Sequence, residues 1–288
     1  MLNNIFATYP GGKNGSGVYQ KIISLMPPHT LYIEPFLGGG AILRAKLPAP
    51  ANIGIDVDGA VIREWQLFPP TTIPNLTILQ GDAITWLQDH ASQLPKTALV
   101  YCDPPYLLST RSKQQQLYTF ELSENQEHRS LLDVLVKLDC MVMISGYWSQ
   151  LYADLLPNWR TFQFQTVTRG GTTALETVWL NFPEPVELHD YRFLGKDYRE
   201  RERIRRKKAR WIEKLNHMPA LERQALLMAI KELGSGSTLP GDTAGSTGDL
   251  GVATRITIPG STAGNDVAPD DVTRADTPIY SDAGHIEN

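Results

Sequence analysis

At 288 residues, the chain is long enough to form one large domain or two modest ones around a hydrophobic core. The formal net charge of −4 does not by itself indicate a nucleic-acid-binding protein, so any such contact must come from a local basic patch. Cys102 and Cys140 have no paired spacing, so we expect neither a disulfide framework nor a metal site. Neither a leader-like N-terminus nor a run of about 18 apolar residues occurs, so we expect a cytoplasmic protein without membrane spans.

Apolar runs alternate with amphipathic stretches from about residue 20 to residue 182, which is typical of a parallel sheet covered by helices on both faces. Strands are predicted over Leu31–Ile33, Asn52–Asp56, Leu76–Gln80, Ala98–Cys102, Cys140–Ser145, Thr161–Thr166 and Glu176–Asn181. Helices are predicted over Ser16–Leu25, Ala41–Lys46, Ala60–Phe68, Ile84–Ser92 and Glu124–Leu138, the last with Ser123 as its cap and Gln126 as the capping partner. A turn at residues 169–172 indicates that the last two strands form an antiparallel hairpin at the sheet edge. The fold class is therefore α/β, with a Rossmann-like sheet.

The composition changes twice after residue 190. Residues 192–214 contain eleven Lys and Arg against four Asp and Glu, a local net charge of +7. A short amphipathic helix is predicted over Ala220–Leu233, because Pro219 precedes it and Gly234 follows it. Residues 235–288 are rich in Gly, Ser, Thr and Asp, which is typical of a disordered acidic tail. We therefore expect an α/β domain over residues 1–190, a basic helical extension over 191–234 and a tail over 235–288.

Three glycines, Gly38, Gly39 and Gly40, lie between the first predicted strand and the following helix. Glycine in such a turn lets the backbone approach a ligand closely, although a plain structural turn has the same composition. Two further strands end in acids, Asp56, where a ribose diol is commonly held, and Asp82, which is suited to accept from an adenine amino group. Each acid alone is equally well explained as a helix cap or turn former. Three strand ends at one crevice favour a cofactor site.

Asp103, Pro104, Pro105 and Tyr106 directly follow the predicted buried strand over residues 98–102. The prolines fix the backbone and remove two N–H donors, which leaves the local carbonyls as acceptors. The carboxylate of Asp103 and the carbonyl of Pro104 could then hold the two N–H bonds of an exocyclic amine and free its lone pair for attack on a methyl sulfonium. Tyr106 offers a face on which to stack a target base, which must be flipped out of a duplex to be reached. The alternative is a Pro-rich turn with a surface tyrosine.

Together these segments resemble the Dam-type (D12 class) family of DNA adenine-N6 methyltransferases over about residues 7–182. The resemblance is carried by Tyr9–Lys13, Glu34–Ala41, Asp56, Gly81–Ala83, Asp103–Tyr106, Ser145–Tyr147 and Glu176–Asn181. It implies a seven-stranded methyltransferase fold, S-adenosylmethionine as the cofactor and DNA as the partner. With the residues identified above, the expected cofactor-binding set is Tyr9, Gly12, Lys13, Glu34, Pro35, Phe36, Gly38, Gly39, Gly40, Asp56, Asp82, Ala83 and Asp103.

The chain departs from the family in the place where DNA is recognised. Dam-type enzymes usually carry a recognition domain between the cofactor motifs and the catalytic tetrapeptide, but Gly40 and Asp103 are only 63 positions apart. Recognition must therefore come from the loop over residues 107–121, the hairpin turn at 169–171 or the basic segment after residue 190. The expected nucleic-acid-binding residues are Arg111, Lys113, Tyr118, Arg169, Arg205, Arg206, Lys207 and Lys208. The block of four basic residues at 205–208 contains no acid, and phosphate contacts from it would orient DNA without specifying a sequence.

Other functions remain open at this point. An RNA adenine or DNA cytosine-N4 methyltransferase would use the same amine chemistry, fold and cofactor. A non-catalytic DNA-binding protein with a methyltransferase shell is a further alternative, although intact Asp56, Asp103 and Tyr106 speak against it. A dehydrogenase is disfavoured, because the glycine turn lacks the G-x-G-x-x-G spacing. The recognition sequence, oligomeric state and any restriction partner or phage role do not follow from the sequence.

Overall fold

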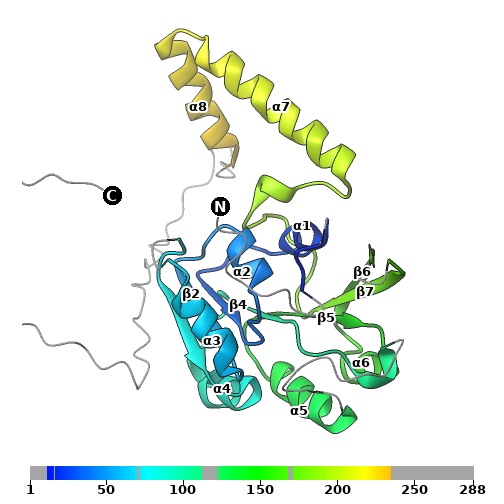
Figure 1. The fold of residues 1–288 in the computed structure, drawn as a ribbon. Helices are drawn as coiled ribbons and strands as arrows, with labels where there is room; N and C mark the ends of the chain where they lie inside the picture. The colour runs from blue at the N-terminus through cyan, green and yellow to red at the C-terminus, as the bar shows by residue number, and fades with distance from the viewer. Residues whose placement is uncertain are drawn as a thin grey trace, which may run out of the picture. The chain divides into compact units, whose positions relative to one another are not determined.

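The computed structural model describes residues 12–15, 17–69, 72–111, 122, 124–167 and 171–234. Within these residues lies a seven-stranded mixed sheet in the order β3-β2-β1-β4-β5-β7-β6 (Figure 1). Its strands are β1 (Leu31–Glu34), β2 (Ala51–Asp56), β3 (Leu76–Gln80), β4 (Ala98–Cys102), β5 (Met141–Tyr147), β6 (Arg160–Val167) and β7 (Thr173–Leu180). The five strands β1 to β5 run parallel to one another, and β7 pairs antiparallel with both β5 and β6. The predicted Rossmann-like α/β fold and its edge hairpin are confirmed.

Burial explains why these segments form strands. β1 and β4 are buried along their whole length, as expected of central strands in a sheet covered on both faces. β6 lies at the sheet edge and alternates between more and less exposed residues, as expected of a strand with one covered face. The central strands therefore carry the core, and their carboxyl ends carry the loops that form the site.

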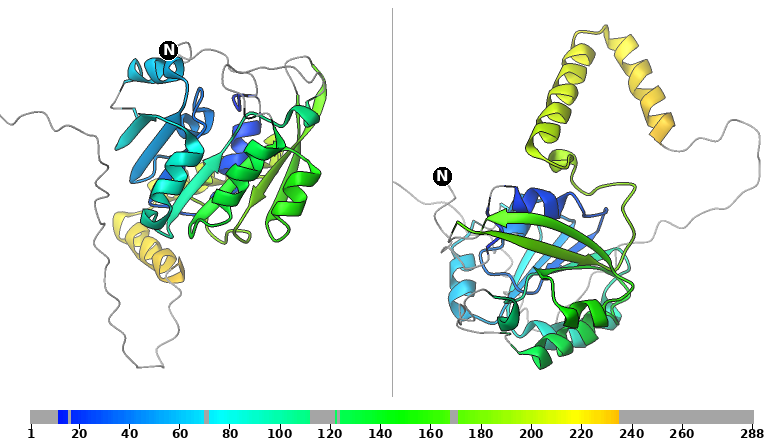
Figure 2. Two further views of the ribbon diagram at one scale, coloured as in Figure 1. Left: turned by 90° about the horizontal axis from the view of Figure 1, so that it is seen from below. Right: turned by 90° about the vertical axis from the view of Figure 1, so that its right-hand side faces the viewer.

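Helices cover both faces of this sheet (Figure 2). Residues of α1 (Val18–Ile23), α2 (Ala41–Ala45) and α3 (Gly59–Gln66) belong to one continuous hydrophobic core. Three further helices, α4 (Ala83–His90), α5 (Asn125–Leu135) and α6 (Gln150–Leu155), pack in a row, α4 against α5 and α5 against α6. Short 3-10 turns occur at Ala91–Gln93, Leu108–Thr110 and Tyr191–Phe193. The result is a sandwich of helices, sheet and helices, with the connecting loops at the strand ends.

One local prediction was wrong, and one helix was missed. Helix α5 is capped by Glu124, which exchanges hydrogen bonds with Glu127, and not by Ser123, which lies outside the described residues, with Gln126. The structure also contains α6, which was not predicted from the sequence. This helix is only six residues long and begins after Ser149, whose hydroxyl accepts from the Tyr152 N–H. A capping side chain fixes a helix start within a single turn, so a helix this short leaves little periodicity in the sequence.

The basic segment forms α7 (Tyr198–Asn216), and α8 (Ala220–Gly234) follows it. The predicted C-terminal helical extension is therefore confirmed. No residue of α7 is buried, and Asp197 caps the helix by accepting from the Glu200 N–H. The predicted tail over residues 235–288 lies outside the described residues. Among the helices that are described, none is both long and apolar enough to cross a bilayer.

Candidate active site

The candidate site lies where the carboxyl ends of β1 and β4 meet. These strands are parallel neighbours, with Leu31 opposite Ala98 and Ile33 opposite Val100. From β1 the chain moves outward to β2 and β3, and from β4 it moves the other way to β5. Such a switch point in a doubly wound sheet is where ligands bind, in the crevice outside the strand ends. The glycine loop after β1 and the Asp103 segment after β4 are thus brought side by side.

The glycine loop between β1 and α2 has a conformation that requires glycine. Gly38 and Gly40 have φ values of 45° and 56°, in the left-handed region. A Cβ atom at Gly40 would lie 2.2 Å from the ring of Trp65, and the Trp65 Nε1–H donates to the Gly38 carbonyl at 2.9 Å. Trp65 therefore holds the loop through ring packing and a hydrogen bond. This residue was not predicted as part of the site, because it lies on the buried face of α3 and resembles an ordinary core residue.

Asp56 lies against this loop, as the strand-end reasoning expected. Its Oδ2 accepts from the Gly38 N–H at 2.8 Å, and its Oδ1 accepts from the Asp58 N–H at 2.9 Å. Burial raises the pKa of this carboxyl above its ordinary value, although the backbone hydrogen bonds oppose that rise. A carboxylate has about four lone-pair sites, so Asp56 can still accept a hydrogen bond from a ligand hydroxyl.

Asp82 is exposed and caps α4. Its Oδ1 accepts from both the Thr85 N–H and the Thr85 hydroxyl at 2.8 Å. Ala83 begins the helix and is buried. The Gly81 N–H donates to the Asp56 carbonyl, which places the end of β3 beside the end of β2. The capping role is thus present in the structure, and Asp82 follows the strand end next to that of Asp56.

Glu34 ends β1 inside the protein. Its Oε2 accepts from the Tyr32 hydroxyl at 2.9 Å and from the Leu43 N–H at 3.1 Å, so it holds the start of α2. Burial is the main cause that raises its pKa to about 8. Pro35 is buried and Phe36 is half-buried in the loop that follows. The expected cofactor residue Gly12 is exposed, whereas Tyr9 lies outside the described residues.

Asp103 is the centre of a polar network at the end of β4. Its Oδ1 accepts from Lys13 Nζ at 2.7 Å and from the Ser145 hydroxyl at 2.9 Å, and the Tyr106 hydroxyl oxygen lies 3.4 Å away. No hydrogen-bond donor from the described part of the chain contacts its Oδ2. The carboxylate is therefore anchored through one oxygen, while the other keeps its full capacity to accept.

Lys13, expected to bind the cofactor, is buried in this network beside Asp103, a member of the same expected set. Besides Asp103, its Nζ donates to the Tyr106 hydroxyl at 2.5 Å and lies 3.2 Å from Glu176 Oε1. The Tyr106 hydroxyl in turn donates a short hydrogen bond to Glu176 Oε1. The sequence placed Lys13 in the site but did not predict these partners, because they lie about 90 and 160 positions away along the chain.

Glu176 belongs to this network but was not selected from the sequence, although it begins one of the segments that carry the family resemblance. It lies on β7 opposite Tyr147 of β5, and its side chain is buried. Burial raises its pKa, while neighbouring Lys13 opposes the rise. The only signal in the sequence was an acid on a strand otherwise composed mainly of apolar and β-branched residues.

The aromatic part of the site is built around Tyr106, which is half-buried. The Tyr106 ring packs edge-to-face on Tyr147, with ring centroids 4.7 Å apart and an angle of 69° between the ring planes. Lys13 Nζ lies 4.9 Å from the centroid of the same ring. Of the two prolines, Pro104 is buried and Pro105 is half-buried. A small hollow beside the ring is lined by Tyr106, Leu107, His128, Gly146, Tyr147 and Tyr152.

The structure corrects the expectation for Arg111. This side chain is buried, and its Nε–H donates to the Tyr106 carbonyl at 2.7 Å. It therefore braces the backbone of the Asp103–Tyr106 segment and does not present its charge on the surface to a phosphate. The expected nucleic-acid contacts Lys113, Tyr118 and Arg169 lie outside the described residues.

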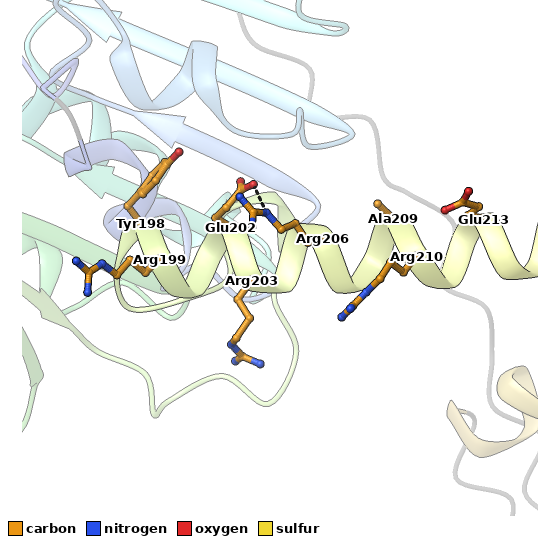
Figure 3. Close-up of a pocket in the computed structure, with 8 residues that line it drawn as sticks. All are labelled: Tyr198, Arg199, Glu202, Arg203, Arg206, Ala209, Arg210 and Glu213. Atoms are coloured by element: carbon orange, nitrogen blue, oxygen red, sulfur yellow. Dashed lines mark hydrogen bonds and ion pairs between the residues drawn. The ribbon is translucent and has the colours of Figure 1, made fainter.

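Helix α7 presents its charges to solvent, and Figure 3 shows one of its faces. Arg205 and Arg206 both bond to Glu202, with N···O distances of 2.7 to 2.8 Å. The block at 205–208 is thus not free of acidic partners, because an acid one turn earlier reaches two of its four members. Lys207 and Lys208 are exposed. The helix keeps a basic surface, but a less concentrated one than the sequence indicated.

No model of a known protein family and no curated protein matches this chain. Among solved structures, precorrin 8W decarboxylase of Methanobacterium thermoautotrophicum is 11% identical, covers 62% of this chain and 98% of its own, and has a TM-score of 0.41. An rRNA methylase from Streptococcus thermophilus is 10% identical over 56% of this chain and 93% of its own, with a TM-score of 0.37. A dimethyladenosine transferase from Plasmodium falciparum is 16% identical over 56% of this chain and 59% of its own, with a TM-score of 0.38. At these scores the similarities assign neither a substrate nor a reaction to this chain.

Within the described residues, no group of three or more His, Cys, Asp and Glu side chains is arranged to hold a metal ion. Among the residues that the structure describes, the charged centre of the site consists of two carboxylates and one ammonium group, and each carboxylate is hydrogen-bonded to neighbouring side chains. An arrangement of this kind can accept hydrogen bonds and stabilise positive charge.

Proposed function

We propose that the chain is a methyltransferase that uses S-adenosylmethionine to methylate the exocyclic N6 amine of adenine in DNA, and that it is a divergent relative of the Dam-type family. One observation carries the proposal. The carboxylate of Asp103 lies at the switch point of the sheet, is anchored through Oδ1 and keeps Oδ2 available beside the glycine loop. The Pro-Pro-Tyr sequence that follows Asp103 supplies carbonyl acceptors without competing N–H donors.

The residues at the strand ends fit this cofactor. Gly38 and Gly40 have conformations that allow a ligand to approach the backbone closely, and Asp56 can accept from a ribose diol at the same loop. The cofactor supplies a methyl group on a positively charged sulfur. Asp103 and Glu176 outnumber Lys13 at the neighbouring strand end, which favours binding of a cation there when both carboxyls are ionised.

The chemistry of Asp103 follows from where charge develops. Amine N–H groups that donate to Asp103 and to the Pro104 carbonyl fix the nitrogen in place. As the nitrogen gains a methyl group it also gains positive charge, and a carboxylate already aimed at it stabilises that charge without having to move. Arg111 supports the geometry, because its bond to the Tyr106 carbonyl holds the segment that carries both acceptors.

DNA is proposed as the substrate because of the resemblance in motifs and the basic surface of α7. Exposed arginines and lysines on one helix provide phosphate contacts that do not depend on base sequence. An adenine within a duplex must be flipped out to reach Asp103. Because phosphate contacts do not read the base sequence, relaxed sequence selectivity is part of the proposal.

The test is transfer of labelled methyl from S-adenosylmethionine to random-sequence duplex DNA and to RNA of matched sequence, followed by nucleoside analysis. N6-methyladenine from DNA supports the proposal, methyladenosine from RNA alone identifies an RNA enzyme, and N4-methylcytosine identifies the cytosine alternative. Absence of product on both polymers, together with absence of cofactor binding, favours a non-catalytic protein.

Two variants make this assay specific. Asp103→Ala removes the proposed acceptor and is expected to abolish product. Asp139→Ala is the matched control, because it removes the same side chain from the surface, where it pairs with exposed Lys96. Equal activity in the two variants would contradict the role given to Asp103.

A further inference from the structure

Lys13 creates an electrostatic problem for the proposed reaction. Its Nζ lies 2.7 Å from Asp103 Oδ1, and the two side chains are only 5% and 18% exposed, so water screens them weakly. Positive charge must develop on a nitrogen held by the same carboxylate. An uncompensated ammonium group at this distance would oppose that charge and weaken the stabilisation that Asp103 provides.

Glu176 faces the same ammonium group from the other side. Its Oε1 lies 3.2 Å from Lys13 Nζ, and its side chain is 5% exposed. The Tyr106 hydroxyl links the two, because it accepts from Lys13 and donates to Glu176. Lys13 is thereby held between two carboxylates that come from strands on either side of β5.

We propose that Glu176 neutralises Lys13, so that Lys13 can anchor Asp103 without cancelling the negative charge that Asp103 offers to the reacting amine. Glu176 is thus a positioning residue that acts through Lys13 and does not touch the substrate. The inference rests on the proposed function, since it concerns the charge that methyl transfer requires.

A purely structural role explains this arrangement less well. Ser145 already anchors Asp103 Oδ1 at 2.9 Å without adding a charge. Burying a carboxylate and an ammonium group costs desolvation energy that apolar side chains of similar size would avoid. The network gains from Lys13 a strong donor to Asp103, and it needs Glu176 to keep the total charge of the site negative.

The experiment is a double-mutant cycle on the full-length protein with Glu176→Gln, Lys13→Met and the double variant. Methyl transfer to duplex DNA gives kcat and KM for each. Glu176→Gln should lower kcat about 10- to 100-fold with KM for cofactor and DNA changed less than about threefold. The double variant should recover about tenfold in kcat over Glu176→Gln, because the uncompensated cation is gone. Losses that simply add, or an unchanged kcat in Glu176→Gln, would overturn the inference.

Two further variants keep the result interpretable. Glu184→Gln, an exposed glutamate beyond β7, should behave as wild type. Glu176→Asp keeps the charge but shortens the side chain, and its kcat should stay within about fivefold of wild type. A loss in Glu176→Asp as large as in Asp103→Ala overturns the proposal, even if Glu176→Gln fails to fold.

Failure of the proposed function is distinguishable, because wild-type protein would then transfer no methyl group. Urea unfolding without any substrate tests the charge balance in that case. The double variant should be more stable than Lys13→Met, because Lys13→Met leaves two neighbouring carboxylates without their shared cation and the double variant leaves only Asp103. A double variant less stable than both would overturn the pairing of Glu176 with Lys13.

Discussion

Two groups of ion pairs in this molecule have nearly the same bond lengths and very different surroundings. Lys13 meets Asp103 at 2.7 Å and Glu176 at 3.2 Å among buried side chains, whereas Arg205 and Arg206 meet Glu202 at 2.7 and 2.8 Å with both arginines 74% exposed. Water and salt screen the α7 pairs but hardly reach the pairs at the end of β4. Burial, and not distance, therefore decides which charges affect stability and chemistry.

The largest expected effect on stability is that of Lys13→Met. The change leaves Asp103 and Glu176 as neighbouring buried carboxylates without their shared cation. Breaking a buried pair in this way costs about 3 to 5 kcal/mol in the free energy of unfolding. Urea unfolding monitored by circular dichroism measures it.

Lys96→Met is the matched control for this change. Lys96 pairs with Asp139 at 3.2 Å, but both side chains are about four-fifths exposed. We expect a stability change within about 0.5 kcal/mol. Similar effects in the two variants would break the comparison between buried and exposed pairs.

The second prediction concerns Glu34, a buried acid that forms no salt bridge with the rest of the described chain. Its folded-state pKa is raised to about 8, mainly by burial, from an ordinary value of 4.5. Between these values the folded state binds more protons than the unfolded state, so this group's contribution to stability is present below about pH 4.5 and is lost as pH rises through 8. The loss amounts to a few kcal/mol at most, because a tenfold change in a proton-binding constant corresponds to about 1.4 kcal/mol.

Glu34→Gln removes this titration while keeping the shape of the side chain. The free energy of unfolding of the wild type, relative to that of the variant, should therefore decrease as the pH increases from about 5 to about 8. Unfolding midpoints in urea at several pH values measure it. Lys46, whose pKa is lowered to about 7 mainly by burial, titrates in both proteins and drops out of the difference, apart from its coupling to Glu34. A pH-independent difference would show that Glu34 is ionised in the folded protein.

The third prediction separates two roles of one exposed acid. Asp82→Ala removes the cap of α4 and should cost about 1 kcal/mol of stability. Asp58→Ala removes the equivalent cap of α3, where the side chain accepts from the Ala60 N–H, at a similar cost. If Asp82 also binds the cofactor adenine, only its variant should lose affinity for S-adenosylmethionine, measured by calorimetry. Equal affinities would restrict Asp82 to capping.

The fold could be predicted from the sequence because each buried strand is a short apolar run bounded by polar turns. The strand ends at Asp56, Asp82 and Asp103 followed from the same reasoning, since parallel strands bring their carboxyl ends to one edge. Element limits shifted by one to three residues, as at β7, where pairing with β6 extends the strand to Thr173.

The side-chain partners could not be predicted in the same way. Lys13 meets Asp103 across 90 positions and Tyr106 meets Glu176 across 70, and no local pattern encodes such contacts. Arg111 looked like a surface cation because its neighbours in sequence are polar, but the Tyr106 carbonyl draws it inward. Trp65 and Glu176 were not predicted as part of the site, because each lies in an element that contributes to the core.

The smallest expected effect on stability is that of changing Arg205 and Arg206 together to Gln. Both are well solvated and already share Glu202, so the unfolding midpoint should not change measurably. Their proposed partners are DNA phosphates, and binding of a cation to a phosphate releases a counterion. The slope of log affinity against log salt should therefore become shallower by up to about 1.8 for duplex DNA.

Because Glu202 competes for both arginines, Glu202→Gln should tighten DNA binding at low salt, which fluorescence anisotropy can measure. If the salt slope stays unchanged in both variants, the DNA-binding surface lies elsewhere and α7 is a solvated helix. If the arginine variant binds DNA more weakly and Glu202→Gln binds it more tightly, exposed charges that contribute little to stability determine DNA binding.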